Sequence, residues 1–100
     1  MKPAARIKGA PIVKDRKVEQ LRKVGKFDEA VEELLRIGRE RALAPSELVL
    51  KGMLIQLGSE AMPCTLMDAE QAYREALEIE GDYVPALIEL GWFSYAVLYR

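Results

Sequence analysis

The chain of 100 residues contains no histidine and a single cysteine, Cys64. Without histidine, metal sites built on imidazole and Ser–His or Cys–His nucleophile pairs are excluded. One cysteine cannot form a disulfide within the chain. No glycine-rich phosphate loop is present either, because the glycines are scattered along the sequence. We therefore expect no enzyme, no cofactor, no metal and no small-molecule substrate.

Long apolar runs are also missing. The longest nearly uncharged apolar stretch, Leu90 to Tyr99, is far shorter than the ~20 residues that span a bilayer. The basic residues near Met1 are not followed by the apolar segment of a secretory signal. We expect a cytoplasmic protein that does not contact a membrane.

The net charge of −1 is the balance of two unequal parts. Residues 1–26 carry a net charge of +7, and residues 27–100 carry −8. Residues 1–14 also contain Pro3, Gly9 and Pro11 and show no helical period. We interpret 1–14 as a basic, flexible arm, of which residues 1–12 are expected to be dispensable for folding, with an anionic partner as the alternative.

Residues 15–100 predict an all-α domain of five helices separated by short turns. The expected helices cover about residues 15–25, 27–44, 46–57, 66–80 and 82–100. Asp15, Ser46 and Asp82 are expected N-caps, and Thr65 with Asp68 has the spacing of a capping box. The third helix is apolar nearly all round, which predicts burial on more than one side.

The chain repeats itself. Ala30 and Gly52 are 22 residues apart, and so are Ala69 and Gly91; a shift of 39 residues brings one pair onto the other. Small residues let two helices approach closely. We therefore expect Ala30, Ala69 and Ala76 to be buried within helical hairpins, with Gly52 and Gly91 at neighbouring contacts.

The repeated unit resembles the tetratricopeptide repeat, a helical hairpin of about 34 residues. The matching residues are Gly25, Phe27 and Ala30 in the first unit, Gly52 on the third helix, and Ala69, Tyr73, Ala76, Leu77, Leu90 and Gly91 in the last. The extra length of the period fits an insertion between Ser59 and Cys64. The resemblance implies about two and a half repeats over residues 15–100, stacked in a short right-handed array. A generic helical bundle is the alternative.

The resemblance also implies a concave groove lined by the first helix of each repeat. Its side chains would be Arg16, Glu19, Arg22, Lys23, Val49, Met53, Gln56, Ile88, Trp92 and Tyr95. The family's carboxylate clamp, which uses Lys, Asn and Arg, is not matched. Such a groove, basic at one end and aromatic at the other, suits a peptide or protein segment with acidic and apolar anchors.

Other functional interpretations are weaker. We expect Cys64 to be an accessible, inert loop thiol, although its place at a helix N-terminus is an argument for reactivity. Glu29, Glu32 and Glu33, like Glu75, Glu78 and Glu80, fit a solvated helix face better than paired catalytic carboxylates. Nucleic-acid binding is not expected, since the basic residues and the aromatics lie at opposite ends of an acidic body.

We expect a non-enzymatic adaptor or assembly factor that holds a protein in its concave face. The alternative is a self-associating unit, a homodimer through the C-terminal helix. That helix carries one charge, Glu89, between Asp82 and Arg100, so its outer side predicts an apolar surface that needs a cover.

Overall fold

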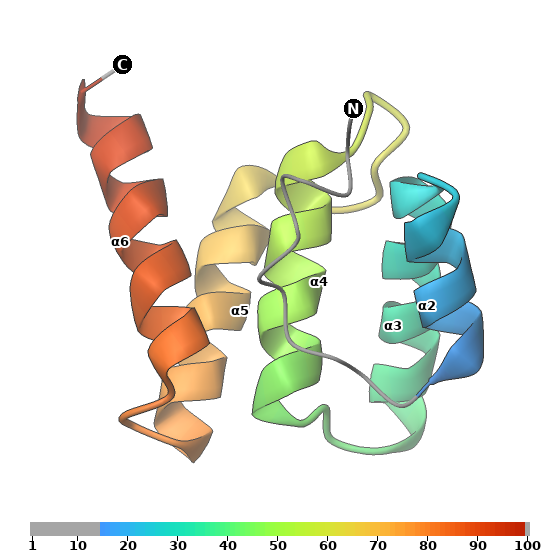
Figure 1. Ribbon diagram of the computed structural model, residues 1–100, viewed down its shortest axis with the longest axis horizontal. Coiled ribbons are helices and arrows are strands. Elements are labelled where there is room, and N and C mark those ends of the chain that lie inside the picture. The colour runs from blue at the N-terminus through green and yellow to red at the C-terminus, as the bar shows by residue number, and fades with distance from the viewer. Residues whose placement is uncertain (1–14, 100) are drawn as a thin grey trace.

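The computed structural model describes residues 15–99, with side chains up to residue 95, and that part contains five α-helices and no strand. The helices are α2 (Arg16–Lys23), α3 (Phe27–Glu40), α4 (Pro45–Leu57), α5 (Leu66–Ile79) and α6 (Val84–Tyr99). The expected all-α class is confirmed, while the expected arm 1–14 lies outside the described residues. Figure 1 shows the helices side by side, with α6 at one end of the row and α2 and α3 at the other.

The first helix begins and ends where the sequence predicts. The backbone N–H of Val18 donates to Asp15 Oδ1 at 2.9 Å, so Asp15 caps α2. Gly25 follows with a φ of 81°, a left-handed conformation that side chains resist. The turn then leads directly into α3, which places the two helices in contact.

The capping box before α5 is also confirmed. The Thr65 N–H donates to Asp68 Oδ2 at 2.9 Å, and the Asp68 N–H donates to Thr65 Oγ1 at 3.3 Å. These two bonds satisfy backbone donors that the first helical turn leaves without a partner.

Two expected caps are wrong. Helix α4 begins at Pro45, so Ser46 lies inside its first turn and Ala44 holds the cap position. Proline has no N–H to satisfy and fits a first turn well. Asp82 lies two residues before Val84, where α6 starts, so it also misses the cap position.

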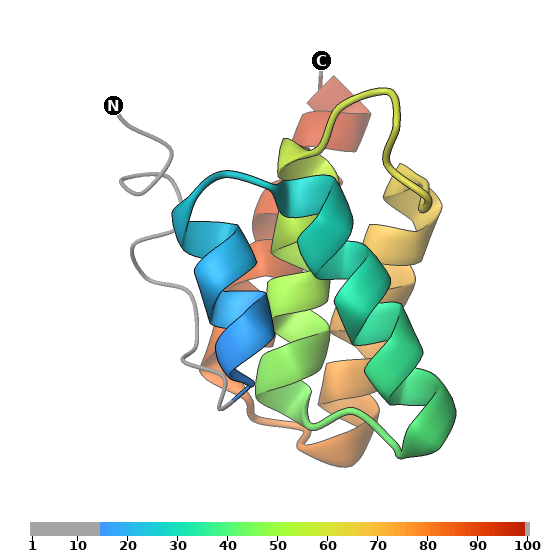
Figure 2. The same cartoon turned by 90° about the vertical axis from the view of Figure 1, so that its right-hand side faces the viewer.

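Helices α4 and α5 form the most extensive helix–helix contact among the described residues, and α4 is the centre of the fold. Figure 2 shows α2 and α3 in front of α4, with α5 and α6 behind. Ala30, Ala69 and Ala76 are fully buried, as expected. The rest of the core is mainly large and apolar: Val18, Val31, Leu34, Ile37, Leu48, Val49, Leu50, Met53, Leu54, Ile55, Tyr73, Ala86 and Phe93.

The two repeated glycines differ. A Cβ on Gly52 would lie 2.4 Å from the Tyr73 ring, so glycine is what lets α4 and α5 approach. Gly91 is exposed, and no described atom beyond its own helix lies within 4 Å of its Cβ position. The expectation that Gly91 lies at a helix contact is therefore wrong within this chain.

The acidic side of α3 is only partly solvated. Glu29 and Glu32 are exposed, but Glu33 is buried and pairs with Arg36 Nη2 at 2.6 Å and with Lys17 Nζ at 3.6 Å. The expectation of a wholly solvated face is thus wrong at Glu33. Because Lys17 belongs to α2, Glu33 helps to hold the first hairpin together.

Candidate functional site

A cleft opens where α3 and α5 both pack on α4 but make little contact with each other. It measures about 570 Å³, within the range of ligand pockets in proteins. Its lining is Leu34, Leu35, Gly38 and Arg39 of α3, Ala42 and Leu43 of the following loop, Leu48 and Lys51 of α4, and Glu75, Glu78 and Ile79 of α5. No local pattern in the sequence predicts this cleft, because it forms between residues that are distant along the chain.

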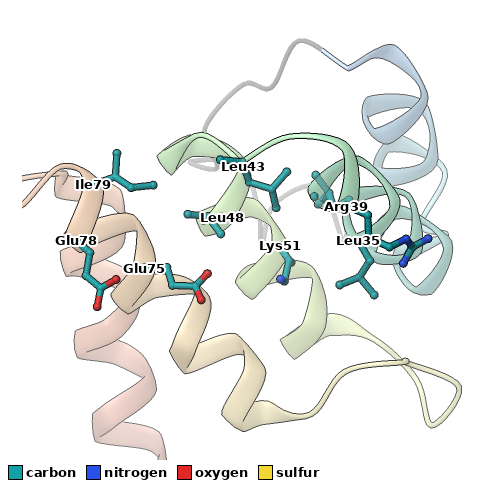
Figure 3. A pocket seen from close by; sticks show the side chains of 11 residues that line it. Leu35, Arg39, Leu43, Leu48, Lys51, Glu75, Glu78 and Ile79 are labelled. Carbon is teal, nitrogen blue, oxygen red and sulfur yellow. The ribbon is translucent and has the colours of Figure 1, made fainter.

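The charges of the cleft lie on different helices. Figure 3 shows Arg39 on the α3 side, Lys51 on α4, and Glu75 and Glu78 on the α5 side. The lining contains no Ser, Thr, Cys or His, so it offers no hydroxyl or thiol nucleophile and no imidazole base. The cleft can contact an apolar group between charges of both signs.

Cys64 does not behave as the accessible thiol that we expected. It is half-buried and packs against the core. Burial, followed by the charge of Asp68, raises the pKa of the Cys64 thiol. Desolvation therefore outweighs the opposing charge of Lys51, and an activated nucleophile at this position is not supported.

The second surface lies on α6. We call it the α6 face and define it by Val84, Leu87, Ile88, Gly91, Trp92 and Tyr95, all of which are exposed. Their spacing places them along one side of the helix. Trp92 is 66% and Tyr95 61% exposed, and the face carries no ionised side chain. The other exposed large apolar residues that the structure describes, Val24, Leu66, Met67 and Ile79, lie on other elements.

The opposite side of α6 is the packed one. Ala86 and Phe93 are buried there, and α6 contacts α5 and α4. Trp92 and Phe93 are thus neighbours in the sequence with opposite environments, which fixes the orientation of the helix. A contiguous apolar stripe with two large aromatics on a packed helix is typical of a surface that binds another molecule.

The residues of the expected groove fall into three groups. Ile88, Trp92 and Tyr95 come together on the α6 face. Val49 and Met53 are buried in the core, and Gln56 is half-buried and accepts a hydrogen bond from the Tyr73 hydroxyl, so the structure does not present the α4 part to a partner.

On α2, the four expected groove residues do not form one open surface. Arg16 and Lys23 are exposed. Arg22 and Glu19 are half-buried and form an ion pair within the helix. Val84 and Leu87 complete the α6 face. Their signal in the sequence is helical spacing, since Val84 lies four residues before Ile88 and Leu87 lies four residues before Gly91.

Comparisons with family models, curated proteins and solved structures found no match to this chain. Within residues 15–99, no helix has both the length and the apolar character needed to cross a membrane. The same residues contain no group of three or more Cys, Asp or Glu side chains placed to hold a metal ion.

Proposed function

We propose that this protein is a non-enzymatic protein-interaction module, a small cytoplasmic adaptor or assembly factor that binds a partner through the α6 face. The observation that carries the proposal is the stripe from Val84 to Tyr95, which is apolar and exposed along its whole length. The resemblance to tetratricopeptide repeats, with a short right-handed stack, supports the same class of function, since such arrays bind other proteins.

The size of the α6 face suits a modest interface. Two aromatic side chains of ~200 Å² each and three aliphatic ones, all about half to two thirds exposed, amount to about 500 Å² of apolar surface. Apolar patches of roughly 300–600 Å² are the largest that ordinary monomers expose, and they are often functional. The α6 face therefore supports binding, with an affinity set by how well the partner fits.

Self-association is the second candidate, because an uncharged apolar stripe can pack against its own copy. Two copies of the α6 face bury about 1,000 Å² in total, the lower limit for a specific interface. Size-exclusion chromatography with light scattering separates the candidates. A monomer at micromolar concentration favours a different partner, and a dimer that Trp92→Glu dissociates favours self-association.

The proposal is tested by affinity capture from the native cell with three baits: the parent chain, Trp92→Glu and Val24→Glu. Val24 is a matched control, because it is equally exposed and apolar but lies at the end of α2. We expect a protein that the parent and Val24→Glu retain and that Trp92→Glu loses, followed by reconstitution from purified components. Identical sets of captured proteins on all three baits would contradict the proposal.

A further inference from the structure

The internal repeat places α6 in register with α4. A shift of 39 residues aligns Leu48 with Leu87, Val49 with Ile88, Gly52 with Gly91, Met53 with Trp92, and Gln56 with Tyr95. The α6 members of these pairs are five of the six residues of the α6 face. The same positions on α4 show what this side of such a helix does when another helix covers it.

The two helices share one packed side and differ on the other. Leu54 and its counterpart Phe93 are both buried, and each helix contacts the helix that precedes it. On α4 the second side is also covered: Leu48, Val49, Gly52 and Met53 are buried and Gln56 is half-buried. On α6 every counterpart is exposed. The α6 face is therefore the repeat of a covered face, without its cover.

Helix α5 provides the cover on α4. The Tyr73 ring lies where a Gly52 side chain would be, and its hydroxyl donates to Gln56 Oε1. Ala69, Ala72 and Ala76 lie four residues before, one before and three after Tyr73, and all are buried. One aromatic ring among small residues is what allows α5 to sit close to α4.

Among the described residues, Gly91 has no such reason to be glycine. Glycine inside a helix is unfavourable relative to alanine. At Gly52 the nearby ring requires it, but at Gly91 no described atom outside its own helix would meet an added Cβ. A ring supplied from outside the chain gives Gly91 the same role as Gly52.

We propose that the α6 face binds an α-helix of a partner protein that crosses α6 at Gly91 as α5 crosses α4 at Gly52. The partner helix presents a Tyr or Phe ring to Gly91, with small residues four positions before it, one before and three after. This inference rests on the proposed function, and it specifies the chemistry of the partner.

A second copy of α6 fits this description less well. The α6 face is bulky on both sides of Gly91, with Ile88, Trp92 and Tyr95 exposed. Two such faces hold their helix axes apart, whereas small residues on a partner interdigitate with large ones. The bulk of the α6 face therefore favours a partner helix of the α5 type.

The experiment supplies such a helix in a defined form. A second copy of residues 58–81, which contains α5, is joined to the C-terminus of the full chain through a flexible Gly/Ser linker. A short linker gives an effective concentration in the millimolar range, so weak packing becomes measurable. We expect acrylamide quenching of Trp92, the only tryptophan, to fall at least twofold and its emission to shift to the blue.

Two variants test the mode of packing. Tyr73→Ala in the appended copy alone removes the ring, and Gly91→Leu fills the space that the ring needs. Both should restore the quenching of the parent chain. Gly91→Leu is not expected to prevent folding, because its side chain enters open space. Protection that survives in both variants would overturn the inference, since it would show unspecific apolar coverage.

Two further results would also overturn the inference. One is the finding that Trp92 stays as exposed with the appended helix as in the parent chain. If Trp92→Glu still abolishes capture of a partner in that case, the proposed function stands and only the binding mode is wrong. The other is a parent chain that is already a dimer with Trp92 protected, since a second copy would then occupy the α6 face. If the appended helix protects Trp92 but no partner protein is captured, the helix crossing at Gly91 is supported and the proposed function is contradicted.

Discussion

At the scale of single residues, glycine has two different meanings in this chain. Gly52 lies under the Tyr73 ring, where any side chain would collide, and Gly91 lies in an equivalent helical position that is open. The sequence alone does not separate them, because both occupy the same place in the repeat. The Tyr73 ring makes Gly52 necessary for the close packing of α4 and α5, and no described atom makes such a demand on Gly91.

Substitutions at the two glycines should change the free energy of unfolding in opposite directions. Gly52→Ala should lower the free energy of unfolding by about 1–3 kcal/mol, because its Cβ would lie 2.4 Å from the Tyr73 ring. Gly91→Ala should raise it by up to about 1 kcal/mol, because alanine favours the helix and nothing opposes its methyl group. Urea denaturation of the two variants measures both values. Destabilisation by Gly91→Ala would show that the Gly91 backbone has a structural constraint not visible in its surroundings.

The Cys64 thiol should react slowly with alkylating reagents. Burial raises its pKa, so at pH 7 less thiolate is present than in an unfolded chain, and access is reduced as well. The rate of alkylation by iodoacetamide at pH 7 should be several-fold lower in the folded protein than in urea. A rate in the folded state equal to that in urea would restore our first interpretation, an accessible loop thiol.

At the scale of elements, buried carboxylates connect the helices. The buried carboxylate of Glu47 accepts two hydrogen bonds from the Arg41 guanidinium, at 2.8 and 2.6 Å, and one from the Ala44 N–H at 2.8 Å. These bonds connect the α3–α4 loop to the first turn of α4. Glu33 connects α2 and α3 through Lys17. Hydrogen bonds from Arg41 and from Arg36, respectively, are the main cause that lowers the pKa of Glu47 and of Glu33.

These two carboxylates predict how stability depends on pH. A group whose pKa is lower in the folded state than its ordinary value of 4.5 stabilises the fold above pH 4.5. That contribution is lost as the pH falls through the folded pKa values, below 4.5. We expect the free energy of unfolding to fall between pH 5 and pH 3.

The control for this prediction is the nearby Glu32, which is exposed. The double variant Glu33→Gln, Glu47→Gln should be less stable than the parent at pH 7 and should lose less stability on acidification. Glu32→Gln should leave the pH profile unchanged. A double variant with the same loss of stability between pH 5 and pH 3 as the parent would mean that other groups cause the acid sensitivity.

The sequence predicts a structural feature correctly where the interactions that cause it lie within a few residues along the chain. Asp15, Gly25, Thr65 and Asp68 act within a few residues of themselves, and their roles are confirmed. The prediction of Ser46 as an N-cap was wrong because α4 already begins at Pro45, one residue before Ser46. The burial of Glu33 depends on a neighbouring helix, which no local pattern shows.

At the scale of the whole molecule, position in the row of helices decides which apolar face is open. Helices α4 and α6 have similar apolar patterns, and for that reason the sequence leads us to expect residues of both helices in one groove. In the structure α4 is central and covered on two sides, which buries Val49 and Met53. Helix α6 lies at the end of the row, and its groove residues Ile88, Trp92 and Tyr95 are exposed (Figure 1). The exposure of the expected groove residues was therefore predictable on α6 and not on α4.

The two adjacent aromatics of α6 allow folding and binding to be separated. Phe93 is buried, so Phe93→Ala should lower the free energy of unfolding by about 3–5 kcal/mol. Trp92 is 66% exposed, so Trp92→Ala should change it by less than about 1 kcal/mol. An aromatic at the centre of an interface contributes about 2 kcal/mol or more to binding, so Trp92→Ala should weaken binding of the captured partner at least tenfold. Urea denaturation and titration with the purified partner measure the two effects. Because the residues are adjacent on one helix, a large loss of stability in Trp92→Ala with unchanged binding would mean that the α6 face serves the fold rather than a partner.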